Sequence, residues 1–365
     1  MTALDFPPET DESLALHQAD PLNGGPDLAA LREAFVTPAS RLFARNHGPV
    51  PRVDPAAFRL EIGGLVAREL RLSLDELRRL PFVRQQATLQ CAGNRRQELT
   101  AIAPIPGELP WGANAIGNGV WGGVPLSALL ALAGVDPAAE HLAFEGLDEI
   151  ERDDRRFAFG GSIPLATLAA AEVLLAYELN GAPLPARNGG PLRAVVPGVV
   201  GARSVKWLGR ITVRDAPSDN YFQTRAYRLL SAADQRAGRD WAEAPMLHEL
   251  WVNAAMCAPQ RGELVAAGPL AVRGYAIAGL GAALLAVEVA LDGGQWRPAA
   301  ITEHGGPGVW SFWETEIELA PGPHALAVRA TDSAGNVQPA APFWNVKGYL
   351  NNGWHRIEIE ALQGV

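Results

Sequence analysis

Residues 88–96 read TLQCAGNRR and place a lone cysteine between a β-prone apolar run and a small-residue turn that is followed by two arginines. Cys91 is therefore expected at the end of a strand, on a turn that Gly93 allows to bend tightly. Arg95 and Arg96 would favour the thiolate if they fold back near the sulfur, because positive charge stabilises it. Such a thiolate can act as a nucleophile, a redox centre or a soft metal ligand. The competing interpretation is a small buried hydrophobic side chain.

Length and composition indicate a globular protein, and its net charge is negative, whereas proteins that bind nucleic acid are usually positively charged. With 365 residues the chain is long for one hydrophobic core, so two domains are expected. Its 48% hydrophobic and 19% charged residues are typical of globular proteins. The net charge of −9 argues against nucleic acid or an anionic membrane as the main partner, so local arginines must attract any anionic ligand.

The first residues, the cysteines and the histidines indicate the cellular location and the kind of metal site to expect. The start, MTALDFPPETDES, is acidic and lacks the basic and apolar regions of a signal peptide, and no apolar run approaches the roughly 20 residues of a membrane span. A cytoplasmic protein is therefore expected. Cys91 and Cys257 do not suggest a disulfide scaffold, and the seven histidines lack zinc-ligand spacing. If a metal is present, Cys91 is its soft protein ligand, and an organic chelate must supply the remaining ligands.

Residues 43–51, FARNHGPVP, form a second segment that carries candidate functional side chains. A glycine and two prolines exclude the interior of a helix or strand, so the segment is predicted to be a fixed loop. That loop displays Arg45, Asn46 and His47. From the residues alone, a solvated polar loop is the alternative.

Residues 183–210, PLPARNGGPLRAVVPGVVGARSVKWLGR, form the third segment. Glycines permit close backbone approach, and Arg193, Arg203, Ser204 and Lys206 offer donors to an anion. The pattern is typical of a phosphate-binding loop.

The remaining chain gives a coarse order of elements. Helices are predicted at 74–80, where Ser73 and Glu76 make a capping box, at 125–134, and from Ser162 as N-cap. From about residue 250 the pattern changes to short strands with turns between them, which predicts an all-β, immunoglobulin-like sandwich. The predicted strands there are 271–276, 284–291, 310–319 and 325–331.

The motifs FARNHGPVP, LQCAGNRR, PLR…VPG…GARSVKWL and the tail WNVKGYLNNGWHR resemble, in the same order, those of the sulfite oxidase family. The similarity runs from about residue 37 to 361. It implies an α+β molybdopterin-binding catalytic domain at 37–245 and an immunoglobulin-like dimerisation domain at 246–365, after an N-terminal arm at 1–36. A homodimer is implied as well.

The resemblance also implies roles for individual residues. Cys91 would be the protein ligand to the molybdenum of Mo-molybdopterin. Arg45 and Arg96 would hold an oxyanion beside the metal oxo group, Tyr227 would hydrogen-bond to that oxo group or to the substrate, and Trp111 would line the pocket. The remaining cofactor contacts implied are Phe43, Asn46, His47, Asp148, Asn188, Arg193, Ser204, Val205 and Lys206. From the residues alone, core packing stays open for Trp111 and Tyr227, and a solvated turn for Asp148.

Two positions depart from the family pattern. Asn188 stands where most relatives have histidine, and it can donate and accept hydrogen bonds but cannot titrate. Ala282 stands where sulfite oxidases carry an arginine in the second domain. The second departure weakens the prediction of sulfite more than the prediction of molybdenum.

The function predicted is that of a haem-free oxidoreductase that converts sulfite to sulfate by oxygen-atom transfer. Its electrons would pass to a separate acceptor, a cytochrome or oxygen. One alternative keeps the cofactor and acts on another oxyanion or a sulfoxide, for example by reducing nitrate. A second alternative is a non-catalytic binding protein on the same scaffold. The intact Cys91, Arg45 and Lys206 argue against that last one.

Overall fold

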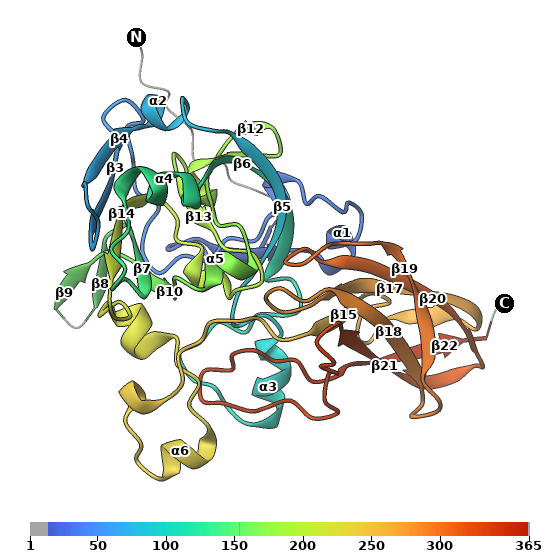
Figure 1. Ribbon diagram of the computed structural model, residues 1–365. Helices are drawn as coiled ribbons and strands as arrows, with labels where there is room; N and C mark the ends of the chain where they lie inside the picture. The colour runs from blue at the N-terminus through green and yellow to red at the C-terminus, as the bar shows by residue number, and fades with distance from the viewer. Residues whose placement is uncertain (1–13, 153, 364–365) are drawn as a thin grey trace.

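The computed structural model describes residues 14–152 and 154–363 (Figure 1). The first 13 residues of the predicted arm, Asp153 and the last two residues lie outside this range. Figure 1 shows a half that mixes short helices with strands, followed by an orange-to-red half built from strands. This arrangement confirms the predicted fold class. No helix in the described part of the chain is long and apolar enough to cross a membrane.

Two sheets form the first half. The first has the order β10-β7-β14-β3-β4 and is antiparallel except where β14 runs parallel to β3. The second has the order β12-β11-β6-β5, with β13 added beside β11. The strands of the first sheet are β3 (Arg59–Gly64), β4 (Leu70–Ser73), β7 (His141–Gly146), β10 (Gly160–Pro164) and β14 (Leu208–Arg214). Those of the second are β5 (Val83–Gln90), β6 (Ile116–Pro125), β11 (Leu174–Leu179), β12 (Ala182–Pro183) and β13 (Arg193–Val195).

The helices are short, and their ends follow local sequence signals. They are α1 (Leu28–Leu31), α2 (Leu74–Leu77), α3 (Arg96–Ile102), α4 (Leu126–Ala133), α5 (Thr167–Ala170) and α6 (Ala232–Arg236). The capping box of Ser73 and Glu76 begins α2, as predicted. Gly134 ends α4 with φ 71°, in the left-handed region that glycine enters without steric cost.

The prediction of a helix that begins at Ser162 is wrong. Ser162 lies inside β10, and its hydroxyl accepts a hydrogen bond from the Ser218 amide at 2.9 Å. Because β10 is the edge strand of its sheet, Pro164 at its end is tolerated there. The helix α5 begins only at Thr167.

The N-terminal arm is folded where it is described. Strands β1 (Leu14–Gln18) and β2 (Asn23–Pro26) form an antiparallel hairpin. Gly24 and Ala44 exchange two backbone hydrogen bonds at 2.9 and 3.0 Å, so the hairpin is joined directly to the FARNH loop. A further small hairpin pairs β8 (Ile150–Arg152) with β9 (Arg155–Phe157).

The second half is a curled eight-stranded sheet with the order β15-β17-β20-β19-β18-β21-β22-β16. Each of the four predicted strands falls on one of these. Their bounds are β15 (Asn253–Ala258), β16 (Leu264–Ala266), β17 (Gly268–Ile277), β18 (Leu284–Leu291), β19 (Arg297–Glu303), β20 (Ser311–Leu319), β21 (Gly322–Asp332) and β22 (His355–Leu362). Alternating side chains such as Val272, Trp313 and Val328 fill its interior.

The two halves share buried surface. Tyr275, Trp310 and Phe312 of the β half belong to the same apolar cluster as Phe144 and Leu208 of the first half. The halves therefore pack as parts of one core and not as separate bodies on a linker.

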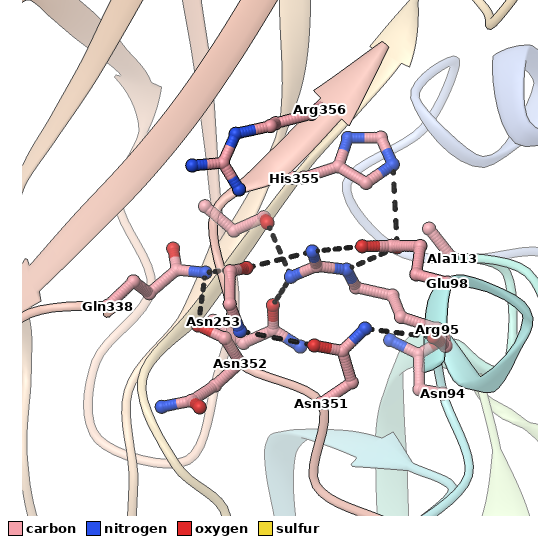
Figure 2. A network of polar contacts seen from close by, with 12 residues as sticks. Asn94, Arg95, Glu98, Ala113, Asn253, Gln338, Asn351, Asn352, His355 and Arg356 are labelled. Carbon is pink, nitrogen blue, oxygen red and sulfur yellow. Dashed lines mark hydrogen bonds and ion pairs between the residues drawn. The ribbon is translucent and has the colours of Figure 1, made fainter. Parts of the chain in front are cut away.

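A buried ionic and hydrogen-bonded network crosses this contact (Figure 2). Arg95 is fully buried and has φ 65°, which turns its side chain toward the β half. Its guanidinium pairs with Glu98 at 2.7 Å and donates to Asn253 Oδ1 at 2.6 Å and to the Gly353 carbonyl at 2.8 Å. The Asn351 side chain donates in turn to the Arg95 carbonyl at 2.9 Å. The network thus fixes the turn after Cys91 to the second half.

We expect Arg95→Met to destabilise the chain strongly. The substitution leaves the Glu98 carboxylate and the Asn253 and Gly353 oxygens without their donor, and removing one partner of a buried pair costs about 3 kcal/mol or more. Calorimetry should show a lower unfolding midpoint. The control is Arg84→Met, which breaks the ion pair of Arg84 with Glu178, where the Arg84 side chain is 56% exposed. Such pairs contribute about 0–1 kcal/mol, so an equal effect of both variants would contradict a stabilising role for the Arg95 network.

Candidate active site

A cavity that is partly open to solvent lies where the three sequence motifs meet. Ten of the residues predicted for the site line it. They come from the FARNH loop, the end of β5, the turn after β7, the segment that surrounds β13 and Lys206, and the turn that ends at Tyr227. These are Phe43, Arg45, Asn46, His47, Cys91, Asp148, Arg193, Ser204, Lys206 and Tyr227. Segments more than 180 residues apart in sequence therefore supply one site.

Cys91 directly follows β5, as predicted. The β5–β6 ladder ends at Gln90 and Ile116, and the Cys91 amide then donates to the Ala115 carbonyl at 2.9 Å. The thiol is buried, and the Gly93 amide donates to its sulfur at 3.4 Å. The sulfur is thus held at the cavity wall by the backbone of its own turn.

The two arginines after Cys91 do not both approach the sulfur. Arg95 points into the network between the halves. Arg96 lies against Gly93, where a Cβ would come within 2.4 Å of its guanidinium. Gly93 is needed to make room for Arg96, and the left-handed residue of this turn is Arg95.

Arg96 is held by protein partners and is not among the residues that line the cavity. It donates to the carbonyls of Leu109 and Lys347 at 2.8 Å and pairs with Glu108 at 3.5 Å. Its guanidinium carbon lies 5.3 Å from the ring centre of Tyr349. That ring stacks on Tyr227 at 5.4 Å.

Tyr227 ends the π-helical turn η4 (Phe222–Ala226). Its hydroxyl lies 2.9 Å from His47 Nε2. Burial raises the pKa of Tyr227 to about 12, so its phenol is protonated at neutral pH. His47 in turn stacks on Phe159 at 5.3 Å, and burial, reinforced by the charge of Arg45, lowers its pKa well below the usual value.

Positive charge dominates the cavity wall. Among the described lining residues, Arg45, Arg193 and Lys206 face one carboxylate, Asp148. Burial lowers the pKa of Arg193 to about 9, and burial together with the Arg193 charge lowers the pKa of Lys206 well below its usual range. Burial also raises the pKa of Asp148. These directions are those of charged groups removed from water, on a wall where cations outnumber carboxylates among the described lining residues.

The residues fit a molybdopterin. A phosphate beside Arg193 and Lys206 would supply the negative charge that their desolvation calls for. Lys206 already donates to Asn46 Oδ1, so the FARNH loop is joined to the cationic wall. Cys91 supplies a soft sulfur ligand at the same cavity. In the described ranges there is no cluster of three or more His, Cys, Asp or Glu side chains placed to hold a metal.

Three more predicted residues lie behind the lining. Trp111 is fully buried and packs with Cys91 and Ala115. The Asn188 carbonyl accepts from Arg193 at 2.6 Å, while its side-chain oxygen is buried without a hydrogen-bond partner among the described residues. Val205 lies in the core, and its carbonyl accepts from the Ala194 amide at 2.9 Å.

Ala282 is buried and lies apart from the residues that line the cavity. Its amide donates to the Gly279 carbonyl at 3.2 Å. The neighbouring Gly281 faces Ala170 of α5. The residue at the position of the family arginine therefore contributes no side chain to the lining of the cavity.

Several site residues carry no signal in the sequence. Asn23 of the N-terminal hairpin is fully buried, and its side-chain oxygen accepts from Arg45 Nη1 at 3.2 Å and from the Asn46 amide at 2.8 Å. Phe159 lines the cavity as well. Each belongs to a run that reads as ordinary strand, loop or core, so only the folded chain identifies them.

The comparisons with known proteins agree with this geometry. Residues 47–222 match the model of the oxidoreductase molybdopterin binding domain, and residues 244–362 match the Mo-co oxidoreductase dimerisation domain. The sulfite oxidases of Homo sapiens and Gallus gallus are 41% and 42% identical to the chain over 96% of its length. The chain spans 66% of the human protein and 78% of the chicken protein.

A solved structure is also similar. The sulfane dehydrogenase SoxCD from Paracoccus pantotrophus superposes with a TM-score of 0.78 at 28% identity, over 93% of this chain and 84% of that one. Together, the matched domains, the relatives and the cavity at Cys91 show that the chain belongs to the sulfite oxidase family of molybdopterin-dependent oxidoreductases, with Mo-molybdopterin as its cofactor.

Proposed function

We propose that this protein oxidises sulfite to sulfate and passes two electrons to a separate acceptor. The observation that carries the proposal is the joint placement of Cys91, Arg45 and Tyr227 on one cavity whose wall has excess positive charge. A soft ligand, a cation and a neutral hydrogen-bond donor suit an enzyme that handles a small oxyanion. The acceptor, a cytochrome or oxygen, and the cytoplasmic location remain predictions from the sequence.

The cofactor would be held by the residues around the cavity. Cys91 would bind the molybdenum, and Arg193, Ser204 and Lys206 would bind the phosphate. Phe43, Asn46, His47, Asp148, Asn188 and Val205 would border the pterin or position its contacts. The bound molybdenum would supply the oxygen-atom transfer and take up the two electrons.

The side chains would orient the substrate. Arg45 presents a planar guanidinium to an oxyanion, and the protonated Tyr227 hydroxyl offers one more donor. Arg96 would contribute positive charge from behind Tyr349, since its own donors already bind carbonyls and Glu108. Trp111 would keep water from the far side of Cys91, because it is fully buried there.

The assay that tests this proposal is steady-state sulfite oxidation with an artificial electron acceptor, with the rate expressed per bound molybdenum. We expect turnover that saturates with sulfite, because the Arg45 guanidinium and the Tyr227 hydroxyl would bind the anion at one defined place. Turnover of nitrate or a sulfoxide without turnover of sulfite would replace sulfite by the alternative substrates. A folded protein that binds no molybdenum and turns over none of these substrates would favour a binding protein.

We expect Cys91→Ser to abolish turnover while the fold persists, since a hard hydroxyl is a poor substitute for a thiolate on molybdenum. Circular dichroism and metal analysis accompany the assay. The matched control is Cys257→Ala, because Cys257 is fully buried in β15 and is not among the cavity-lining residues. Near-full turnover of Cys91→Ser would refute the assignment of the metal ligand.

We expect a homodimer of about twice the 38.8 kDa chain mass. The match of residues 244–362 to a dimerisation domain supports this, and closed two-fold dimers are the commonest oligomers. Light scattering coupled to size exclusion gives the mass directly. A monomer at micromolar concentration would contradict this expectation. The β half would then serve to hold the turn after Cys91 through the network around Arg95.

A further inference from the structure

A continuous chain of polar contacts joins Asn23, Arg45, His47 and Tyr227, in that order, and the last three of these line the cavity. His47 Nδ1 lies 3.3 Å from Arg45 Nη2, and His47 Nε2 lies 2.9 Å from the Tyr227 hydroxyl. Each ring nitrogen therefore has one polar partner. The protonation of the ring decides which partner donates.

The partner on Nδ1 can only donate, because a guanidinium has no acceptor. Nδ1 must then be the unprotonated nitrogen of a neutral ring, and the proton must lie on Nε2. The surroundings agree with a neutral ring. Burial and the charges of Arg45, Arg152, Lys206 and Arg96 all lower the pKa of His47.

Asn23 holds Arg45 in the position that this assignment needs. Its side-chain amide donates to the Pro21 carbonyl at 2.9 Å and to Gln18 Oε1 at 3.1 Å. Its oxygen is thereby turned to Arg45 Nη1, at 3.2 Å. Stacking on Phe159, with ring planes 13° apart, fixes the orientation of the His47 ring.

The consequence falls on Tyr227. If His47 Nε2 donates to the phenol oxygen, the phenol hydrogen cannot point back at His47 and is available to another acceptor. The ring itself is held by stacking on Tyr349, with planes 18° apart. Tyr227 lines the cavity, so a bound oxyanion is the acceptor within its reach.

We propose that His47 is a positioning residue: as the Nε2-protonated tautomer fixed by Arg45, it directs the Tyr227 hydroxyl to donate into the cavity. This inference rests on the proposed function for the identity of the acceptor, but the tautomer itself does not. Arg45 would thus serve both the substrate and, through His47, the orientation of the second donor.

The tautomer is measured by nitrogen-15 NMR on the holoenzyme labelled with ¹⁵N-histidine, with the His47 signals assigned by their loss in His47→Gln. We expect a neutral ring at pH 7 with the proton on Nε2. A neutral ring protonated on Nδ1, or an imidazolium at pH 7, would overturn the proposal. This readout does not depend on turnover, so a failure of the sulfite assignment leaves it decisive.

The effect on turnover is measured with two matched variants, with kcat given per bound molybdenum. The amide nitrogen of Gln reproduces the donor at Nε2, whereas Asn keeps an acceptor near Nδ1 but is too short to reach Tyr227. We expect kcat of His47→Asn to be about tenfold below that of His47→Gln, which is the size of one lost hydrogen bond, with a smaller change in KM.

The same pair is then compared in the Tyr227→Phe background. If His47 acts through the phenol, the difference between Gln and Asn disappears there. Equal kcat for the two single variants, or a difference that persists without the phenol, would show that His47 does not act through Tyr227.

Discussion

The position of the cysteine sulfur depends on the buried ion pair and hydrogen bonds of Arg95. The turn after β5 has two faces, with Cys91 on the cavity and Arg95 in the contact with the β half. Asn94 strengthens the same turn, since it donates to the Tyr275 hydroxyl at 3.0 Å and accepts from the Ala115 amide at 3.0 Å. If Cys91 binds the metal as proposed, its sulfur needs a defined direction, and the contact with the β half would supply it.

The cations of the cavity wall differ from Arg95, because the described residues that line the cavity include fewer carboxylates than cations. Arg193 and Lys206 are desolvated without a matching number of carboxylates, which disfavours their charged forms in the free chain. If the cofactor phosphate binds there as proposed, it would offset that cost by supplying the counter-charge. The Arg95 guanidinium has a carboxylate partner within the protein, whereas the Arg193 guanidinium donates to backbone carbonyls and has no carboxylate partner among the described residues.

The N-terminal hairpin shows how far the site extends beyond its motifs. Asn23 is part of a segment that resembles a linker, yet it holds both Arg45 and the Asn46 backbone. Asn46 reaches across to Lys206. The hairpin, the FARNH loop and the segment that carries Lys206 are thus joined by side-chain hydrogen bonds, so a change in one is expected to reach the others.

Local signals in the sequence determined where elements begin and end. The capping box of α2, the glycine after α4 and the strand before Cys91 depend on neighbours within a few residues, and each is found as predicted. The order of the motifs likewise identified most of the cavity wall. Only the tertiary structure decided where long side chains point. Arg95 and Arg96 are adjacent and chemically alike, but a left-handed φ and buried partners up to about 260 residues away send them in different directions. Pro164 ends a strand and does not lie in the first turn of a helix, because it lies on a sheet edge, which no local pattern reveals.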